Sequence, residues 1–225
     1  MAYEQVGDGG MAHRIARLAG LGKQAALWLA LLLAASVFAQ NATAAAEPQD
    51  LLRSFYEVLL GNMKEGRMLG EGGRYARLTP VVSRTFDISS MTRLAIGPSY
   101  GTLAAPTQQQ LMAAFAHYVA ATYADQFDAF SGEQLQVIGQ RPFGQDIMVQ
   151  TKIVKSNGEA TRLDYLMHQN QDGWQITDVY LDGTISQLAV HRSEFHSILQ
   201  REGIDGLVVA LNRKVDLLSG VARSP

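Results

Sequence analysis

The short motif with the clearest suggestion of chemistry is Gly97-Pro98-Ser99-Tyr100-Gly101, which matches the G-x-S-x-G pattern of serine hydrolases. That chemistry needs a strand before the serine and a helix directly after it, so that the hydroxyl stands on a strained turn. Here a helical pattern precedes the motif, and residues 102–106 are expected to form a loop. We therefore interpret the motif as a turn rather than as an esterase site.

Asp178 is the most notable acid, because it falls within a run of β-branched and aromatic residues. An inward carboxylate in a curled sheet can act as a general base, as in some isomerases. More often such a carboxylate accepts hydrogen bonds from the backbone or from tyrosine, and we favour this structural role. A triad of Ser99, Asp178 and either His191 or His196 has a permitted chain order, but order alone is weak evidence.

Metal and cofactor chemistry find little support in the residue types. The histidines after residue 46 form neither H-x-x-x-H nor H-E-x-x-H; they are His117, His168, His191 and His196. The chain has no cysteine, which removes thiolate ligands, disulfides and a cysteine nucleophile. The sequence contains no dinucleotide fingerprint, and a net charge of −2 does not indicate nucleic-acid binding. We expect no cofactor and no enzymatic activity.

The stretch that positions Asp178 is residues 145–183, where Asn157-Gly158 and Asp172-Gly173 separate three runs rich in β-branched and aromatic residues. Such dipeptides are the strongest short-range hairpin signals, because both residues tolerate positive φ. We predict a three-stranded antiparallel meander. A three-residue first loop, 156–158, gives one clean apolar face. Its cross-strand pairs are Ile147–Met167, Val149–Tyr165, Thr151–Leu163 and Ile153–Thr161.

The second turn of the meander leaves two registers open. A two- or four-residue loop places one set of residues on the apolar face: Trp174, Ile176, Asp178 and Tyr180. A three-residue loop places Val179 and Leu181 there instead. We favour the first register because it keeps the opposite face polar, and Asp178 then points toward an apolar interior.

A sheet with one apolar face needs a cover, which the rest of the chain supplies as helices. Apolar spacing predicts helices over 48–62, 80–96 with a break near Asp87, 107–130, 186–202 and 205–219. Five glycines make 61–73 a predicted loop, and 135–139 is a predicted strand followed by a turn at Pro142 and Gly144. The fold class is therefore α+β, with a curled antiparallel sheet of about four strands packed with helices.

The predicted helix over 107–130 has two features of its own. Thr107 and Gln110 form a capping box at its start. It also carries a broad apolar stripe, made of Leu111, Phe115, Tyr118, Val119, Thr122, Tyr123, Phe127 and Phe130. The stripe suits either a large core or the lining of a lipid-sized cavity, and both interpretations stay open.

Residues 1–46 have the parts of a secretory signal peptide. Basic residues up to Lys23 precede an apolar run over 25–38, and small-residue cleavage patterns follow as far as residue 46; Met11 is an alternative start. The run is shorter than the roughly 20 residues that span a membrane, so we expect cleavage, with retention as an inner-membrane anchor as the alternative. The remainder is one domain, 47–220, and a tail, 221–225.

Two ordered sets of residues resemble a known family. The first set is Phe86-Asp87, Met91, Leu94-Ala95-Ile96-Gly97, Tyr100, Gln110, Phe115 and Tyr118. The second is Leu163-Asp164-Tyr165, Gly173-Trp174-Gln175-Ile176-Thr177-Asp178-Val179, Gly183-Thr184-Ile185-Ser186, Arg192-Ser193-Glu194-Phe195, Gly203, Leu207, Leu211 and Lys214. In order and spacing they resemble the MlaC-like proteins, also called the toluene-tolerance family of ABC-transporter auxiliary components. Tyr100, where that family usually has tryptophan, and the glycine-rich segment 61–73 are more similar to its hopanoid-biosynthesis-associated branch, HpnM.

This resemblance implies an NTF2-like fold with extra helices around an apolar cavity, and a periplasmic carrier that is not an enzyme. The carrier would bind the acyl or polycyclic part of a phospholipid or hopanoid. It would shuttle this lipid between an inner-membrane ABC transporter and an outer-membrane acceptor, and so contribute to outer-membrane lipid asymmetry. The alternatives are a non-binding accessory protein of hopanoid biosynthesis or export, and an NTF2-like enzyme that uses Asp178.

The candidate lipid-binding residues come from the predicted apolar faces of the helices and of the meander. They are Phe86, Met91, Leu94, Phe115, Tyr118, Val119, Val149, Ile153, Leu163, Tyr165, Met167 and Ile176.

Overall fold

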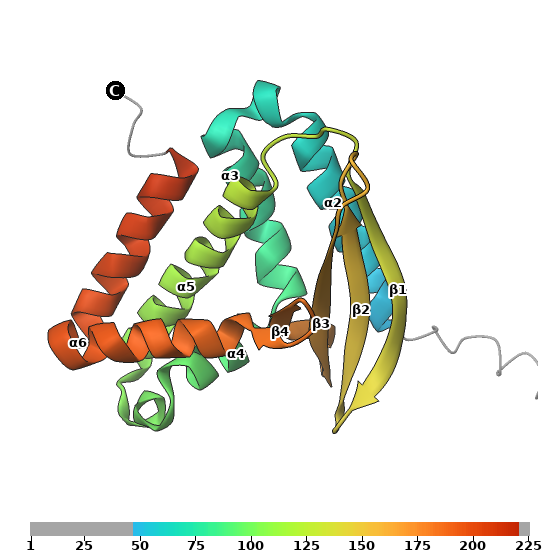
Figure 1. Cartoon of the computed structure of the whole chain (residues 1–225). Helices are drawn as coiled ribbons and strands as arrows, with labels where there is room; N and C mark the ends of the chain where they lie inside the picture. Colours follow the sequence, from blue (N-terminus) through green and yellow to red (C-terminus); the bar gives the residue numbers. More distant parts are fainter. Residues whose placement is uncertain (1–46, 221–225) are drawn as a thin grey trace, which may run out of the picture. The chain divides into compact units, whose positions relative to one another are not determined.

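Five antiparallel strands form one open sheet in chain order, β1-β2-β3-β4-β5. The structure, a computed structural model, describes residues 47–220, so the predicted signal peptide and tail lie outside the described residues. The strands are β1 Gln134–Phe143, β2 Asp146–Val154, β3 Ala160–Asn170, β4 Gly173–Leu181 and β5 Ile185–Ser186. Figure 1 shows this sheet edge-on, with α3, α5 and α6 on one side of it.

The hairpin formed by β2 and β3 has the predicted register. Val154 pairs with Ala160, which leaves residues 156–158 at the tip, and Gly158 has a φ of +86°. The pairs Ile147–Met167, Val149–Tyr165 and Ile153–Thr161 are confirmed. Only glycine adopts such a φ at little cost, which explains why this loop fixes the register.

The predicted register of the second hairpin, formed by β3 and β4, is correct near the turn but not along the whole of β4. Asn170 pairs with Gly173 across a two-residue turn, and Met167 pairs with Ile176, as predicted. A bulge then inserts Thr177, so that Leu166 pairs with Asp178 and Tyr165 with Val179. The extra residue moves the following side chains to the opposite face, so the prediction that Asp178 and Tyr180 share the inner, apolar face with Ile176 is wrong. Val179 and Leu181 take the inner positions beyond the bulge.

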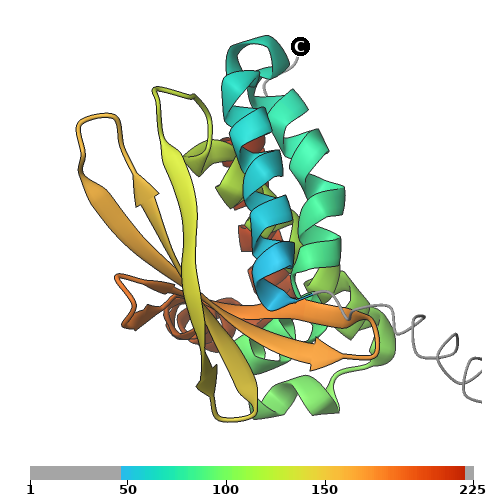
Figure 2. The ribbon, with the colours of Figure 1, turned by 90° about the vertical axis from the view of Figure 1, so that its right-hand side faces the viewer.

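The helices are α2 Pro48–Lys64, α3 Gly66–Thr85, α4 Ile88–Ile96, α5 Ala105–Gln126 and α6 Gln187–Ser219, with a 3₁₀ turn η1 at Pro98–Thr102. The predicted break near Asp87 is confirmed, since the Asp87 carboxylate accepts a hydrogen bond from the backbone N–H of Ser90 and caps α4. Figure 2 shows α2 and α3 running side by side across the sheet.

The prediction that residues 61–73 form a loop is wrong. Helix α2 continues to Lys64 and α3 starts at Gly66, with one non-helical residue, Gly70, inside it. Buried Arg74 holds this region, because its guanidinium donates to the carbonyls of Ala124 and Gly66. Tertiary contacts of this kind outweigh the low helix propensity of glycine, which is only about 1 kcal/mol per residue.

Two predictions about α5 are also wrong. The helix begins at Ala105 with Pro106 in its first turn, and Thr107 makes no capping hydrogen bond. Instead, the Gln108 side-chain amide donates to the carbonyls of Tyr100 and Leu103. The helix ends at Gln126 rather than at residue 130, because Phe127 leaves the helical conformation and its ring stacks on Tyr123.

The remaining elements agree with the predictions except in extent. Helix α6 consists of two limbs that meet at Gly203, whose φ is +68°, and Ser186 caps its start. Strand β1 is longer than the predicted 135–139 and has a bulge at Ile138. Its pairing with β2 continues to Phe143, so the prediction that Pro142 lies in the turn is wrong, whereas Gly144 does lie there. Within residues 47–220, no helix is both long enough and apolar enough to cross a bilayer.

The core fills the space between the inner face of the sheet and the helices. Phe55 of α2, Phe86 after α3 and Tyr123 of α5 meet with ring centroids 5.3 to 5.6 Å apart. Edge-to-face and tilted aromatic contacts at this distance add to the stabilisation from burial alone. Phe86 and Tyr123 of this aromatic group also line a large cavity, described next.

Candidate functional site: an apolar cavity

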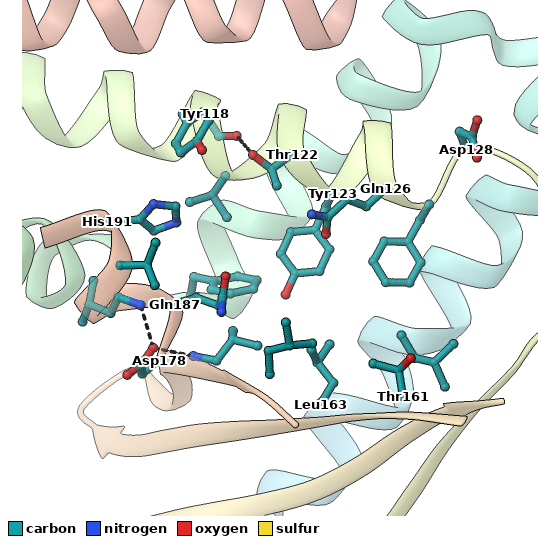
Figure 3. A pocket seen from close by; sticks show the side chains of 18 of the residues that line it. Tyr118, Thr122, Tyr123, Gln126, Asp128, Thr161, Leu163, Asp178, Gln187 and His191 are labelled. Carbon is teal, nitrogen blue, oxygen red and sulfur yellow. Dashed lines mark hydrogen bonds between the residues drawn. The ribbon is translucent and has the colours of Figure 1, made fainter. Parts of the chain in front are cut away.

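A cavity of about 580 Å³ lies between α5, the inner face of the sheet and the first limb of α6. One face of α5 forms a long wall through Val119, Thr122 and Tyr123, which recur at helical spacing. Figure 3 shows Tyr118 and His191 toward one end, Asp128 and Thr161 toward the other, and Tyr123 between them. The volume falls within the roughly 300–1,000 Å³ that is typical of small-molecule sites.

Six of the twelve predicted lipid-binding residues line the cavity: Phe86, Met91, Tyr118, Val119, Ile153 and Leu163. Five others are fully buried in the core and are not in the lining: Phe115, Val149, Tyr165, Met167 and Ile176. Leu94 lies elsewhere, since its side chain is 50% exposed on α4. The apolar pattern therefore identified inward faces but could not separate the lining from the packed core.

The sequence-based selection missed much of the lining. The missed apolar residues are Met63, Tyr123, Phe127, Val179, Leu181, Leu188 and Val190. Tyr123 and Phe127 belong to the aromatic stripe of α5, so that stripe could have revealed them. Val179 and Leu181 occupy the inner face only because of the bulge at Thr177, for which the sequence has no distinct signal.

Asp178 reaches the cavity wall, but its carboxylate is already occupied. It is 6% exposed and accepts hydrogen bonds from the backbone N–H groups of Val179 (2.7 Å) and Leu188 (3.0 Å) and from the Ser186 hydroxyl (2.5 Å). Asp178 thus joins β4 to the first turn of α6, in agreement with the structural role favoured above. Its carboxylate oxygens are therefore engaged by donors of the protein itself.

The G-x-S-x-G motif is a turn, as predicted. Ser99 is exposed in η1 and follows helix α4 rather than a strand. The local geometry therefore lacks the strand–turn–helix arrangement that exposes a nucleophilic serine. Across residues 47–220, no three His, Asp or Glu side chains are grouped so as to hold a metal ion.

One end of the cavity is aromatic and includes the imidazole ring of His191. Its imidazole packs against Phe115, Tyr118 and Phe195, with ring centroids 5.5 to 5.8 Å apart. Burial lowers the pKa of His191, and Glu194, 3.9 Å from the ring, partly opposes this effect. The imidazole is therefore held in the neutral form, which suits an apolar wall.

An ion pair ties the two limbs of α6 together beside this ring. The Lys214 ammonium lies 3.2 Å from the Glu194 carboxylate and 5.0 Å from the centroid of the Tyr118 ring. Glu194 and Tyr118 both line the cavity, so this contact joins the second limb of α6 to the cavity wall.

The opposite end of the cavity is polar and partly exposed. Gln126, Asp128 and Glu133 line it, together with Lys155, whose ammonium pairs with Glu159 at 2.9 Å. The cavity thus combines an apolar interior with a solvated, hydrogen-bonding rim. This arrangement accommodates a molecule with a long apolar part and a polar end.

Comparison with solved structures gives a match to a phospholipid-binding protein from Ralstonia solanacearum, solved in complex with a phospholipid at 1.53 Å resolution. The TM-score is 0.65 at 22% sequence identity, over 77% of this chain and 99% of that one. At this level of identity the likeness establishes a shared fold, an α+β arrangement of helices on an antiparallel sheet.

The family model described as MlaC protein matches residues 54–213. This span includes α3, α4, α5, the whole sheet and most of α6, and thus nearly every element that lines the cavity. The chain therefore belongs to the MlaC family.

Proposed function

We propose that this protein is a lipid carrier that encloses the acyl part of a phospholipid in the cavity of α5, the sheet and α6. The observation that carries the proposal is the cavity itself, about 580 Å³ of space with an apolar interior and a polar rim. Membership of the MlaC family and the shared fold with a phospholipid-binding protein support the same ligand class.

Burial of the lipid chain supplies enough energy without any reacting group. An acyl chain of about 15 methylenes gains on the order of 10 kcal/mol, at about 0.8 kcal/mol for each methylene removed from water. Binding of this strength makes unaided release slow. A carrier therefore needs partners that open the cavity or compete for the lipid, and we propose an inner-membrane ABC transporter and an outer-membrane acceptor in these roles.

The proposal also includes the cellular compartment in which the carrier works and the identity of the lipid that it binds. We infer that residues 1–46 direct export to the periplasm, where a carrier between two membranes has to work. A hopanoid remains the second candidate lipid, supported by Tyr100 and the glycine-rich segment 61–73. Tyr100 is buried in η1 and is not in the cavity lining, so it offers no direct contact that favours a polycyclic ligand.

A carrier requires no catalytic group, and we propose that the protein is not an enzyme. The strongest candidate base, Asp178, uses its carboxylate oxygens to accept three hydrogen bonds from the protein. Ser99 stands in an exposed 3₁₀ turn that is not in the cavity lining.

Filling the cavity tests the proposal. Val119 is 7% exposed and lines the cavity, so a Val119→Trp substitution places a large ring in the space meant for the lipid. Uptake of a phospholipid with a fluorescent acyl chain from vesicles should fall at least about tenfold, because displaced methylenes cost about 0.8 kcal/mol each. The matched control is Val209→Trp, at a site that is 59% exposed on α6, and it should take up lipid normally. Equal uptake by both variants would refute the proposal.

A further inference from the structure

A chain of buried hydroxyls runs from the sheet toward the cavity. The Thr151 hydroxyl donates to the Leu163 carbonyl, so the Tyr56 hydroxyl donates to Thr151 Oγ1, 2.6 Å away. Tyr165 comes next. It is fully buried, its ring lies 5.9 Å from that of Tyr56, and its hydroxyl interacts with the hydroxyls of Tyr56 and Tyr123 without a well-aligned hydrogen bond to either. Buried hydroxyls normally have a hydrogen-bond partner, and these two phenols are the neighbours that can serve Tyr165.

Tyr123 completes this chain at the cavity. Its ring packs among Phe55, Phe86 and Phe127, and only 8% of the residue is exposed. Figure 3 shows its hydroxyl directed away from α5 into the space of the cavity. The hydroxyls of Tyr123 and Tyr165 are near enough to influence each other's pKa. The series therefore runs through the buried phenol of Tyr165 to that of Tyr123, which reaches the ligand space.

The hydroxyls of this cluster are neutral donors. Burial raises the pKa of Tyr56 to about 12 and raises the pKa values of Tyr123 and Tyr165 further above the ordinary range. The lining cation Lys155 lies at the exposed rim in its pair with Glu159, and the neutral His191 lies at the far end. The part of a ligand that meets Tyr123 is therefore uncharged, because nothing there compensates a buried charge.

The depth of Tyr123 indicates which part of a lipid this is. Tyr123 precedes Gln126, the first residue of the polar rim along α5, by three residues, or about 4.5 Å along the helix axis. In a diacyl glycerolipid the ester groups lie between the charged headgroup and the chains. A headgroup at the rim thus brings an ester carbonyl about one turn inward. An ester carbonyl only accepts hydrogen bonds, which matches a phenol hydroxyl that can donate one.

We propose that the Tyr123 hydroxyl donates a hydrogen bond to an ester carbonyl of a bound glycerolipid and thereby sets how deeply the lipid enters the cavity. Tyr165, whose hydroxyl interacts with that of Tyr123 in the core, acts as a positioning residue for the Tyr123 hydroxyl. The inference rests on the proposed function, since it requires that a lipid occupies this cavity. It adds a chemical preference, for ester-linked over ether-linked lipids, that apolar packing alone does not produce.

A competition experiment measures this preference directly. The protein, exported from the full-length chain and purified without detergent, is incubated with vesicles that contain equal amounts of a diacyl phosphatidylethanolamine and its dialkyl ether analogue. The two lipids have the same chains and headgroup and differ only at the carbonyls. Native mass spectrometry then gives the ratio of ester to ether lipid bound. One hydrogen bond corresponds to about a three- to tenfold preference for the ester.

Two variants assign the preference to the phenol. Tyr123→Phe removes the hydroxyl and keeps the ring, and should bring the ratio close to one. Tyr75→Phe is the matched control, because the Tyr75 hydroxyl pairs with His117 outside the cavity lining, and it should keep the wild-type ratio. A wild-type ratio near one, or a ratio that survives Tyr123→Phe, overturns the inference while leaving the carrier function intact. Binding of neither lipid overturns both.

Discussion

Single residues at the cavity wall have structural tasks that substitutions can separate from lipid binding. Asp178 joins β4 to α6 through three accepted hydrogen bonds. We expect Asp178→Asn to lower the free energy of unfolding by about 1–3 kcal/mol, because an amide replaces a charged acceptor. Urea denaturation measures this loss, and bound lipid should remain stoichiometric. Asp172→Asn, in an exposed turn, is the control. Loss of lipid from a folded Asp178→Asn protein would favour the enzyme or ligand-contact interpretation of this acid.

The tyrosine chain predicts two unequal effects of the same chemical change. Tyr56→Phe removes a hydroxyl that bonds to Thr151 and should cost about 1 kcal/mol of unfolding free energy. Tyr165→Phe removes a buried hydroxyl whose interactions with the hydroxyls of Tyr56 and Tyr123 are poorly aligned, and it should cost less, at most about 0.5 kcal/mol. Parallel urea titrations compare the two variants. A larger loss for Tyr165→Phe than for Tyr56→Phe contradicts the arrangement described here.

His191 predicts a pH dependence of stability. Burial lowers its pKa in the folded protein below the ordinary value of 6.5, so between these two values the unfolded chain binds more protons. The contribution of His191 is therefore complete above about pH 6.5 and is lost as the pH falls toward the folded-state pKa. We expect His191→Phe to flatten the decline in unfolding free energy between about pH 7 and about pH 5. An unchanged decline would show that other groups cause it.

At the level of elements, one glycine fixes the start of α3 against the rim of the cavity. A Cβ on Gly66 would lie 1.9 Å from the backbone oxygen of Asp128, a rim residue, and neither backbone can move freely. We expect Gly66→Ala to destabilise the protein by about 1–3 kcal/mol or more. The control is Gly61→Ala in α2, where a Cβ has open space, and it should stabilise by about 0.5–1 kcal/mol. Thermal or urea unfolding measures the stability of both variants. Equal stabilities would contradict the steric explanation.

The elements that could be predicted from the sequence are those governed by local rules. The loop at 156–158 fixed the register of β2 and β3, because Gly158 meets a backbone requirement that sequence displays. The helical run through 66–73 escaped prediction, because its support comes from Arg74, whose partner carbonyl of Ala124 is distant in sequence. The bulge at Thr177 escaped for the same reason, and it changed which side chains of β4 face inward.

The cavity was predictable only in part for a related physical reason. The spacing of apolar residues predicts which side chains are buried, and Val119 and Phe115 fit the helical spacing equally well. Only packing decides that Phe115 is enclosed by Phe195 and His191 whereas Val119 borders open space. The family resemblance, by contrast, rests on many residues in order, and the match over residues 54–213 confirms it.

On the scale of the whole molecule, the fold covers one face of a curled sheet with helices but leaves a volume unfilled. The resulting cavity of about 580 Å³ has the size of a small-molecule site, and its lining is largely apolar. A polar rim at one end and an aromatic wall at the other match an amphipathic ligand.

The measurement that tests this account most directly is native mass spectrometry combined with solvent extraction. The protein is exported to a periplasm from the full-length chain and purified without detergent. The account predicts a stoichiometric lipid, with a diacyl phospholipid supporting the primary proposal and a hopanoid supporting the second candidate. A protein that carries no lipid, and takes up none after incubation with phospholipid or hopanoid vesicles, would contradict the carrier function and favour a non-binding accessory role.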